Sequence, residues 1–374
     1  MKHLVYIILV LSNVLQQPVY SQEARARARD IGIEVGVMET GKLNSITDVP
    51  GVMVGHTTLI RGDSIRTGVT AILPHSGNIF QKKVPASIVV FNAFGKLAGY
   101  TQVKELGNIE TPVILTNTLS VPVAVNALIK YTLNQKGNEN VRSVNGVAGE
   151  TNDGFLNDIR GMHVTEDDII RAIHLAQSGP VEEGSVGAGT GTCALGYKGG
   201  IGTSSRLLPP IDGKQYIIGV LVQSNFGREL IINGVPFPRK NPMAATNYEY
   251  DRGSCMIVIA TDAPLSVRNL ERLGKRSFIG MGRTTTVMSN GSGDYSIVFS
   301  TAYRIPYRME RQTIDIPPLV SNDYMTILFR AVEEATQEAI YNSLFMATTI
   351  RGFRGHTMET IPLEKVKEMM EKYK

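Results

Sequence analysis

Short apolar runs of strand length, separated by glycine and proline, are the feature that most restricts the fold of this chain. Four of them are clear: "TAILP" (70–74), "ASIVVFN" (86–92), "TPVILTN" (111–117) and "QYIIGVLVQSN" (215–225). Runs of this kind, bounded by turn residues, predict β-strands. The 37 glycines support this interpretation, because they indicate tight turns and places where backbones approach closely. The chain is therefore expected to build on β-sheets.

Helical patterns lie between these strands, without a regular alternation of strand and helix. "VPVAVNALIKYTLNQKG" (121–137) has apolar residues at helical spacing and ends at a glycine, and "TEDDIIRAIHLAQSG" (165–179) begins at the N-cap Thr165. The C-terminal part predicts, in order, a strand at 256–260, a helix from the N-cap Asp262 to about Arg276, strands at "SFIGMG" and "YSIVFSTA", and a long helix capped by Asn322. The pattern indicates a layered α/β or α+β protein, one large domain with helices on both sides of its sheets.

Residues 1–21, "MKHLVYIILVLSNVLQQPVYS", have the form of a secretory signal peptide. Their apolar stretch is shorter than the roughly 20 residues that span a membrane. We therefore expect an exported protein, periplasmic or secreted, with no membrane partner. "RARARD" (25–30) is expected to be a mobile lead-in of the mature chain. The net charge of +4, without a tract of lysine and arginine, argues against a nucleic-acid partner.

Several common sites are not indicated by the sequence. The two cysteines, Cys193 and Cys255, lie in apolar or glycine-rich stretches and are expected to be buried free thiols, and without a nearby histidine they do not form a zinc site. The glycine-rich block 184–206 has neither the dinucleotide fingerprint nor the lysine of a phosphate-binding loop, so we interpret it as strands with glycine where backbones crowd. The histidines show no metal-binding spacing, and no motif indicates a Ser-His-Asp triad. His56 and His75 follow strand-like runs and are the candidates for a catalytic histidine.

One dipeptide suggests a chemistry that needs no histidine. "GS" at Gly253–Ser254 follows a polar segment without periodicity (238–252) and precedes the apolar strand at 256–260. If the bond between the two residues is cut, Ser254 gains an α-amine, whose ordinary pKa near 8 lies well below the roughly 10.4 of lysine. Such an amine can serve as general base for the hydroxyl of its own residue. Taken alone, a "GS" before a strand is most often only a turn.

The wider context favours the cut. The chain resembles the family of D-/L-aminopeptidase–esterases and β-aminopeptidases, which are self-processing serine peptidases. The resemblance runs from about residue 44 to the C-terminus and rests on seven segments in one order: "ITDVPGVMVGHTT", "RTGVTAILP", "GETNDGFLND", "GTGTCALGYKGGIGTSSR", "VQSNFGR", "GSCMIVIATDAPL" and "NGSGDYSIVFS". It implies a four-layer αββα sandwich that is similar to the N-terminal-nucleophile hydrolases but has a different connectivity.

The resemblance also implies how the chain is divided. After removal of the signal peptide (1–21), a large subunit (22–253) and a small subunit (254–374) would remain together as one folded domain. Autoproteolysis would occur between Gly253 and Ser254, and Ser254 would then be the nucleophile. Processed heterodimers are expected to assemble as a homotetramer. No metal and no organic cofactor is expected.

The remaining site residues are implied by the same resemblance. Ser292 and Asp294 in "GSGD" would bind and orient the amine of Ser254, with Asp294 one methylene shorter than the glutamate of other members. Asn225 would donate to the oxyanion of the transition state. Glu150 would bind the free amine of the substrate, and Asn152, where some members have an aromatic residue, would contribute to side-chain preference. The expected substrates are short peptides, amides or esters with a free amine.

Two other functions are open on the sequence. Ornithine acetyltransferases share this fold and transfer an acyl group to an amine, but they use threonine as nucleophile and have no export signal. A binding protein on a catalytically inactive scaffold is the third possibility. The presence of Ser254, Ser292, Asp294 and Asn225 together favours hydrolysis over both.

Overall fold

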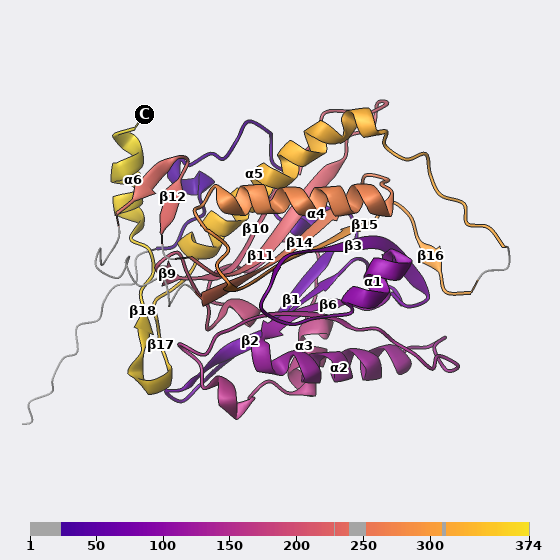
Figure 1. The fold of residues 1–374 in the computed structure, drawn as a ribbon, viewed down its shortest axis with the longest axis horizontal. Helices are drawn as coiled ribbons and strands as arrows, with labels where there is room; N and C mark the ends of the chain where they lie inside the picture. The colour runs from indigo at the N-terminus through magenta and orange to yellow at the C-terminus, as the bar shows by residue number, and fades with distance from the viewer. Residues whose placement is uncertain (1–23, 228, 239–251, 309–311, 374) are drawn as a thin grey trace, which may run out of the picture.

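Two β-sheets pack face to face between two layers of helices in the computed structural model, which describes residues 24–227, 229–238, 252–308 and 312–373 (Figure 1). The first sheet has five strands in the order β1 (Met53–Arg61), β2 (Ile65–Leu73), β6 (Val113–Asn117), β7 (Val147–Thr151) and β4 (Leu97–Ala98). The second has seven, in the order β10 (Gly200–Leu207), β11 (Ile217–Asn225), β14 (Arg252–Thr261), β15 (Gly291–Ser300), β3 (Lys82–Ala93) and β16 (Ile305–Pro306), with β5 (Asn108–Ile109) also pairing with β3.

Each sheet carries helices on its outer face. Figure 1 shows α4 (Val267–Gly282) and α5 (Met325–Phe345) across the seven-stranded sheet, and α2 (Val121–Leu133) and α3 (Glu166–His174) on the opposite side. Three apolar clusters fill the spaces between the four layers: one under α4 and α5, one between the sheets, and one under α2 and α3. The predicted four-layer αββα sandwich is therefore confirmed. The smaller elements are α1 (Tyr100–Leu106), α6 (Leu363–Glu371) and the hairpins β8–β9 (Cys193–Ala194, Tyr197–Lys198), β12–β13 (Leu230–Ile232, Val235–Phe237) and β17–β18 (Ile350–Arg351, Thr357–Met358).

The sequence of strand β14 is apolar almost throughout, and the packing of the strand explains why. Side chains alternate across a strand, so Cys255 and Ile257 belong to the cluster under the helices, whereas Met256 and Val258 belong to the cluster between the sheets. Both faces are buried, and the strand therefore reads as a continuous hydrophobic run. The predicted strand at 256–260 is confirmed, and it begins earlier, at Arg252.

The four apolar runs first identified in the sequence are confirmed as parts of β2, β3, β6 and β11. Helix α3 begins after Thr165 as predicted, with a capping box to Asp168, but it ends at His174, and α2 ends at Leu133. The glycine-rich block contains β8, β9 and β10, as its interpretation as strands required.

Three local predictions in the C-terminal part are wrong. "SFIGMG" is the last turn and a half of α4 and not a strand, because its apolar residues Phe278 and Met281 are three apart and face the core. The N-cap of α4 is Ser266, while Asp262 accepts a hydrogen bond from the backbone N–H of Ile217. Asn322 lies in a 3₁₀ turn before α5, and its side chain accepts from Arg268 and Arg272 instead of capping the helix.

The expected mobile lead-in, "RARARD", is instead docked. Arg25 donates to the carbonyl of Phe345 at the end of α5, and Arg27 forms an ion pair with Glu183 at 2.7 Å. Arg29 pairs with the buried Glu338 of α5 at 3.0 Å. Arg25 and Arg29 therefore tie the N-terminal part of the chain to α5, whereas Arg27 ties it to Glu183 and to the carbonyl of Thr203.

Two segments that matter to the sequence predictions lie outside the described residues. They are residues 1–21, the predicted signal peptide, and residues 239–251, nearly all of the polar segment before Gly253. In the part of the chain that is described, no helix is long and apolar enough to cross a membrane. Both cysteines are free thiols, as predicted, with Cys255 buried and Cys193 partly so.

Candidate active site

Ser254 lies near the start of β14, between two strands that bring the other predicted residues to it. β11 runs antiparallel to β14 and ends at Asn225, which is directly opposite Ser254. β15 runs parallel to β14, with Gly293 beside Ser254 and therefore Ser292 and Asp294 on either side. The C-terminal end of β11 thus lies beside the N-terminal ends of β14 and β15. All four predicted catalytic residues lie at these strand ends.

The hydroxyl of Ser254 points at the peptide bond that precedes it. Its Oγ donates to the carbonyl oxygen of Gly253 at 2.6 Å and lies 3.4 Å from the backbone nitrogen of Gly293. Gly253 itself has no room for a side chain, because a Cβ there would lie 2.6 Å from the Cα of Phe226. The serine is 5% exposed, so the bond is held tightly inside the sheet.

Ser292 and Asp294 form the pair that their spacing predicts. Residues two apart on a strand face the same way, and Ser292 Oγ donates to Asp294 Oδ1 at 3.0 Å. Both side chains are buried. They bring a hydroxyl and a carboxylate to the strand adjoining Ser254, a suitable environment for an ammonium group.

The side-chain amide of Asn225 is oriented from both ends. Its Oδ1 accepts from the backbone N–H of Cys193 at 2.9 Å, and its Nδ2 donates to the carbonyl of Asn152 at 3.0 Å. Because Nδ2 carries two hydrogens, one remains for another acceptor. The amide is therefore preorganised as a hydrogen-bond donor next to Ser254.

Glu150 reaches the site from the other sheet. It is near the end of β7, and β7 lies close over β14, since a Cβ on Gly149 would collide with the side chain of Met256. The carboxylate accepts from the backbone N–H of Lys96 at 3.0 Å and from the hydroxyl of Thr118. The side chain is 2% exposed, and burial raises the pKa of this carboxyl above its usual range.

Asn152 contributes to the site in a way that the sequence did not predict. Its side chain is exposed and accepts from the backbone N–H of Gly154, as in a local turn. Its backbone carbonyl, however, is the group that binds Nδ2 of Asn225. The residue therefore orients the amide of Asn225 through its main chain, whatever its side chain contacts.

A buried lysine supports the same amide, and the sequence analysis missed it. Nζ of Lys198 donates to the carbonyls of Gly189 and Gly199, at 2.8 and 2.7 Å, and so fixes the glycine-rich segment that carries Cys193. The side chain is fully buried, and burial lowers the pKa of Lys198 to about 7. A lysine inside an apolar, glycine-rich stretch was the available signal.

The cysteines and histidines do not compete for the role of nucleophile or base. Cys255 adjoins Ser254 but faces the helices, and burial raises the pKa of its thiol. His56 contacts Thr70, and burial lowers its pKa to about 4. The other histidines have their contacts elsewhere: His75 with Lys82, His163 with Asp158, His356 with Phe155, and His174 exposed at the end of α3. No hydrogen bond joins Ser254 to a histidine among the described residues.

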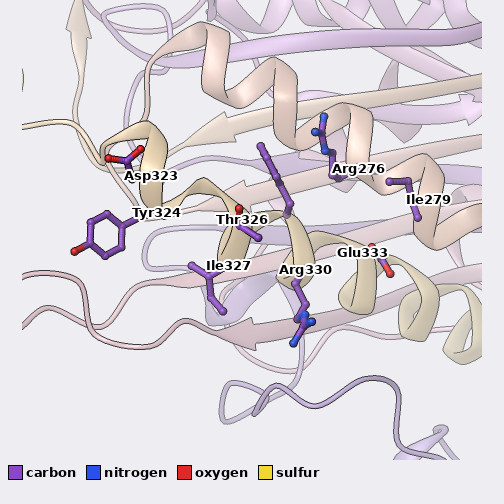
Figure 2. Close-up of a pocket in the computed structure, with 9 residues that line it drawn as sticks. Arg276, Ile279, Asp323, Tyr324, Thr326, Ile327, Arg330 and Glu333 are labelled. Atoms are coloured by element: carbon purple, nitrogen blue, oxygen red, sulfur yellow. The ribbon is translucent and has the colours of Figure 1, made fainter.

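A separate pocket of about 600 Å³ lies on the outer helical layer. Figure 2 shows its lining residues projecting from α4, from the 3₁₀ turn before α5 and from the first half of α5, among them Arg276, Tyr324 and Arg330. None of the predicted site residues lines it. Within the described ranges, no three His, Cys, Asp or Glu side chains are grouped so that they could hold a metal ion.

Known proteins match the chain along most of its length. The family model of peptidase family S58 matches residues 44–358. The β-peptidyl aminopeptidase of Sphingosinicella microcystinivorans is 39% identical over 93% of this chain and 92% of its own.

Two solved structures have the same fold. A β-aminopeptidase from a Burkholderia species has 35% identity and a TM-score of 0.84, covering 93% of this chain and 99% of its own. The L-aminopeptidase D-Ala-esterase/amidase of Ochrobactrum anthropi has 34% identity and a TM-score of 0.86, covering 93% and 98%, and is described as a prototype of the serine aminopeptidases with a variant of the N-terminal-nucleophile hydrolase fold. The chain therefore belongs to peptidase family S58 and is a hydrolase with the fold of an N-terminal-nucleophile serine aminopeptidase.

Proposed function

We propose that this protein cuts itself between Gly253 and Ser254 and then acts as an aminopeptidase on short peptides, amides and esters with a free amine. The observation that carries this proposal is the position of the Ser254 hydroxyl, 2.6 Å from the carbonyl oxygen of Gly253. Asn225, Ser292 and Asp294 lie on the two strands beside it, and Glu150 lies on the facing sheet.

Self-cleavage would begin with attack of Ser254 Oγ on the carbonyl carbon of Gly253. The C–N bond between the two residues breaks, the acyl group moves to Oγ, and the nitrogen of Ser254 becomes a free amine. Water then hydrolyses the ester, which leaves a carboxylate on Gly253 and restores the hydroxyl. The absence of a side chain on Gly253 supports this step, because the backbone can pack against Phe226 while its carbonyl oxygen lies 2.6 Å from Oγ.

In each later turnover, the new amine would take the proton of the Ser254 hydroxyl as the latter attacks the substrate carbonyl. Ser292 and Asp294 would bind this amine and stabilise its protonated form. The free hydrogen on Nδ2 of Asn225 would stabilise the oxyanion. The buried carboxylate of Glu150 would bind the ammonium of the substrate and thereby select an unblocked N-terminus. The protonated amine then donates to the leaving group, and water releases the acyl product.

Substrate range, export and assembly are part of the same proposal. Similarity to a β-peptidyl aminopeptidase and to an L-aminopeptidase D-Ala-esterase/amidase supports testing β-, L- and D-amino acyl groups. We propose export on the evidence of residues 1–21, and a tetramer of cut chains by the resemblance to the family.

The test is to purify the protein and separate it under denaturing conditions. We expect two chains, the smaller with the N-terminal sequence Ser254–Cys255–Met256, and activity only in the cut form. Ser254→Ala should remain one uncut chain with no activity. A fully active intact chain, or cutting of Ser254→Ala at this bond, would contradict the mechanism. Product analysis with and without an added amine acceptor separates hydrolysis from acyl transfer.

A further inference from the structure

The ring of Tyr295 is held between two glycines. A Cβ placed on Gly293 would lie 2.9 Å from Cε2 of this ring, and a Cβ on Gly95 would lie 3.2 Å from its hydroxyl oxygen Oη. The ring therefore passes over the backbone of β15 and ends beside the segment that follows β3. A side chain at either glycine would occupy the space of the ring, so both positions are adapted to it.

The hydroxyl end of this ring, Cε2 and Oη, meets two parts of the candidate site. Gly293, which faces Cε2, is the residue whose backbone nitrogen lies 3.4 Å from Ser254 Oγ. On the other side, the same Cβ on Gly95 that would approach Oη would also lie 2.7 Å from Oε1 of Glu150. The hydroxyl end of the tyrosine thus lies between the strand segment beside the nucleophile and the carboxylate that is proposed to bind the amine of the substrate.

The hydroxyl of Tyr295 has no hydrogen-bond partner within the described part of the chain, although the side chain is only 3% exposed. The oxygen itself is not among the buried side-chain atoms that lack a partner in the described part of the chain, so it is open to a ligand. The neighbouring carboxylate is also partly used, since Glu150 already accepts from the N–H of Lys96 and the hydroxyl of Thr118. A ligand group with several donors would satisfy both residues.

We propose that Oη of Tyr295 is a second acceptor for the ammonium group of the substrate, shared with Glu150, and that the ring forms the floor of the acyl subsite. This inference rests on the proposed aminopeptidase function and deepens it. An ammonium has three N–H donors, so one hydrogen can go to Tyr295 while Glu150 neutralises the charge. Burial, together with the carboxylates of Glu150 and Asp294, raises the pKa of Tyr295 to about 12, so the hydroxyl is neutral at ordinary pH.

The test is Tyr295→Phe, which removes the hydroxyl and keeps the ring. For an amino-acyl ester we expect KM to rise roughly ten- to a hundredfold, the effect of losing a hydrogen bond to a charged group. We expect kcat to change by less than a few fold. Self-cleavage should be unchanged, because it involves no free amine. The same ester without its amine should be hydrolysed equally by the variant and the wild type.

Two controls keep the result interpretable. Tyr303→Phe removes the hydroxyl of a half-buried tyrosine that follows β15 and donates to the carbonyl of Leu265, and it should leave KM unchanged. Tyr295→Met also lacks the hydroxyl but packs differently, so it should show the same loss of amine recognition. Equal losses with the ester that has no amine, or a KM for the amino-acyl ester within twofold of wild type, would overturn the inference.

The inference and the proposed function can fail separately. A wild-type protein that stays uncut and inactive would contradict the proposed function. Calorimetric titration of wild type and Tyr295→Phe with an amino-acid amide then still decides the inference, because binding requires no turnover. Equal affinity of the two proteins would overturn it, and a tenfold or greater weakening in the variant would support it.

Discussion

The seven-stranded sheet carries two buried polar clusters, which differ in how completely their hydrogen bonds are made. The first surrounds Arg206 on β10. Its guanidinium is fully buried and forms ion pairs with Glu334 at 3.2 Å and Glu338 at 2.7 Å. All three of its nitrogens donate, and further partners are Ser204, Val35 and the carbonyl of Ser205. This cluster has no donor left over for a ligand.

The second cluster surrounds Ser254 and is open. The hydroxyl donates only to the carbonyl just before it, the amide of Asn225 has a hydrogen to spare, and the hydroxyl of Tyr295 has no partner among the described residues. Both clusters cost desolvation energy. The closed one recovers this energy within the fold, whereas the open one can recover it only from groups that arrive later. Saturation of hydrogen bonds therefore distinguishes the polar residues that hold the sheet from those that perform the reaction.

The largest effect that would sharpen this contrast is Arg206→Met. Removing one partner of a buried ion pair leaves uncompensated charge, so we expect the free energy of unfolding to fall by about 3–5 kcal/mol. Denaturant unfolding in a Ser254→Ala background measures this on a single uncut chain. In a cut protein that still folds, kcat should be unchanged. A large loss of kcat with little loss of stability would contradict the division between the two clusters.

A surface pair provides the matched control for that measurement. Arg283, directly after α4, forms an ion pair with Glu333 in the interior of α5, and the arginine side chain is about half exposed. Pairs of this kind contribute less than about 1 kcal/mol. Arg283→Met should therefore have little effect on unfolding.

Asn225→Ala is expected to have the opposite profile. Loss of an oxyanion donor lowers kcat by roughly 10²–10³-fold. Self-cleavage should slow as well, because the same amide faces both reactions. Steady-state kinetics and the rate at which the precursor disappears measure the two effects. The free energy of unfolding should change much less than in Arg206→Met.

Ser224→Ala is the control for Asn225. Ser224 precedes it on β11, but its hydroxyl contacts Ser343 of α5 at 2.7 Å, on the side away from the site. We expect kcat within about twofold of wild type. If Ser224→Ala were as impaired as Asn225→Ala, the loss in both would reflect disruption of β11 and not loss of the donor.

The smallest effect concerns Glu150. Glu150→Gln should raise KM for amino-acyl substrates with little change in kcat. In wild type, the affinity for the substrate ammonium requires the carboxylate, so it is lost as the pH falls through the pKa of Glu150, and burial places this loss above the usual range of glutamate. The variant should show no such step in a profile of KM against pH. A step that persists in Glu150→Gln would assign the titration to another group.

Burial of Glu150 also makes the free energy of unfolding depend on pH, in the direction opposite to that of substrate affinity. Because the folded-state pKa of Glu150 is raised, its stabilising protonated form is present at low pH and is lost as the pH rises through that pKa. Glu150→Gln should accordingly melt no lower than wild type at neutral pH.

Much of the fold and several site positions could be predicted from the sequence. The strand runs are long and apolar because β11 and β14 are buried on both faces, and Ser292 and Asp294 share a side because a strand alternates. The positions of Asn225 and Glu150 required the resemblance to a family, because no local pattern in the chain connects residues 75 apart. Such pairs meet only through the order of strands and the stacking of the sheets.

The features that the sequence did not predict also depend on contacts between distant parts of the chain. The docking of Arg25, Arg27 and Arg29 depends on carbonyls and carboxylates about 150 to 340 residues further along the chain, so an isolated arginine-rich segment gives no indication of it. The amide of Asn225 is oriented by backbone groups of Cys193 and Asn152, for which any residue type would serve. "SFIGMG" is ambiguous in the sequence, because six apolar and small residues do not by themselves distinguish a buried strand from the end of a helix.

The order of strands around β14 has a consequence for the chain after a cut at Gly253. β14 and β15 come from the C-terminal piece, yet each is paired on its outer side with a strand of the N-terminal piece, β11 on one side and β3 on the other. The two pieces cannot part without breaking both ladders, so dissociation and unfolding become the same event. The nick would change the molecularity of folding: the precursor reaches its fold as one molecule, whereas the separated products would have to find each other again.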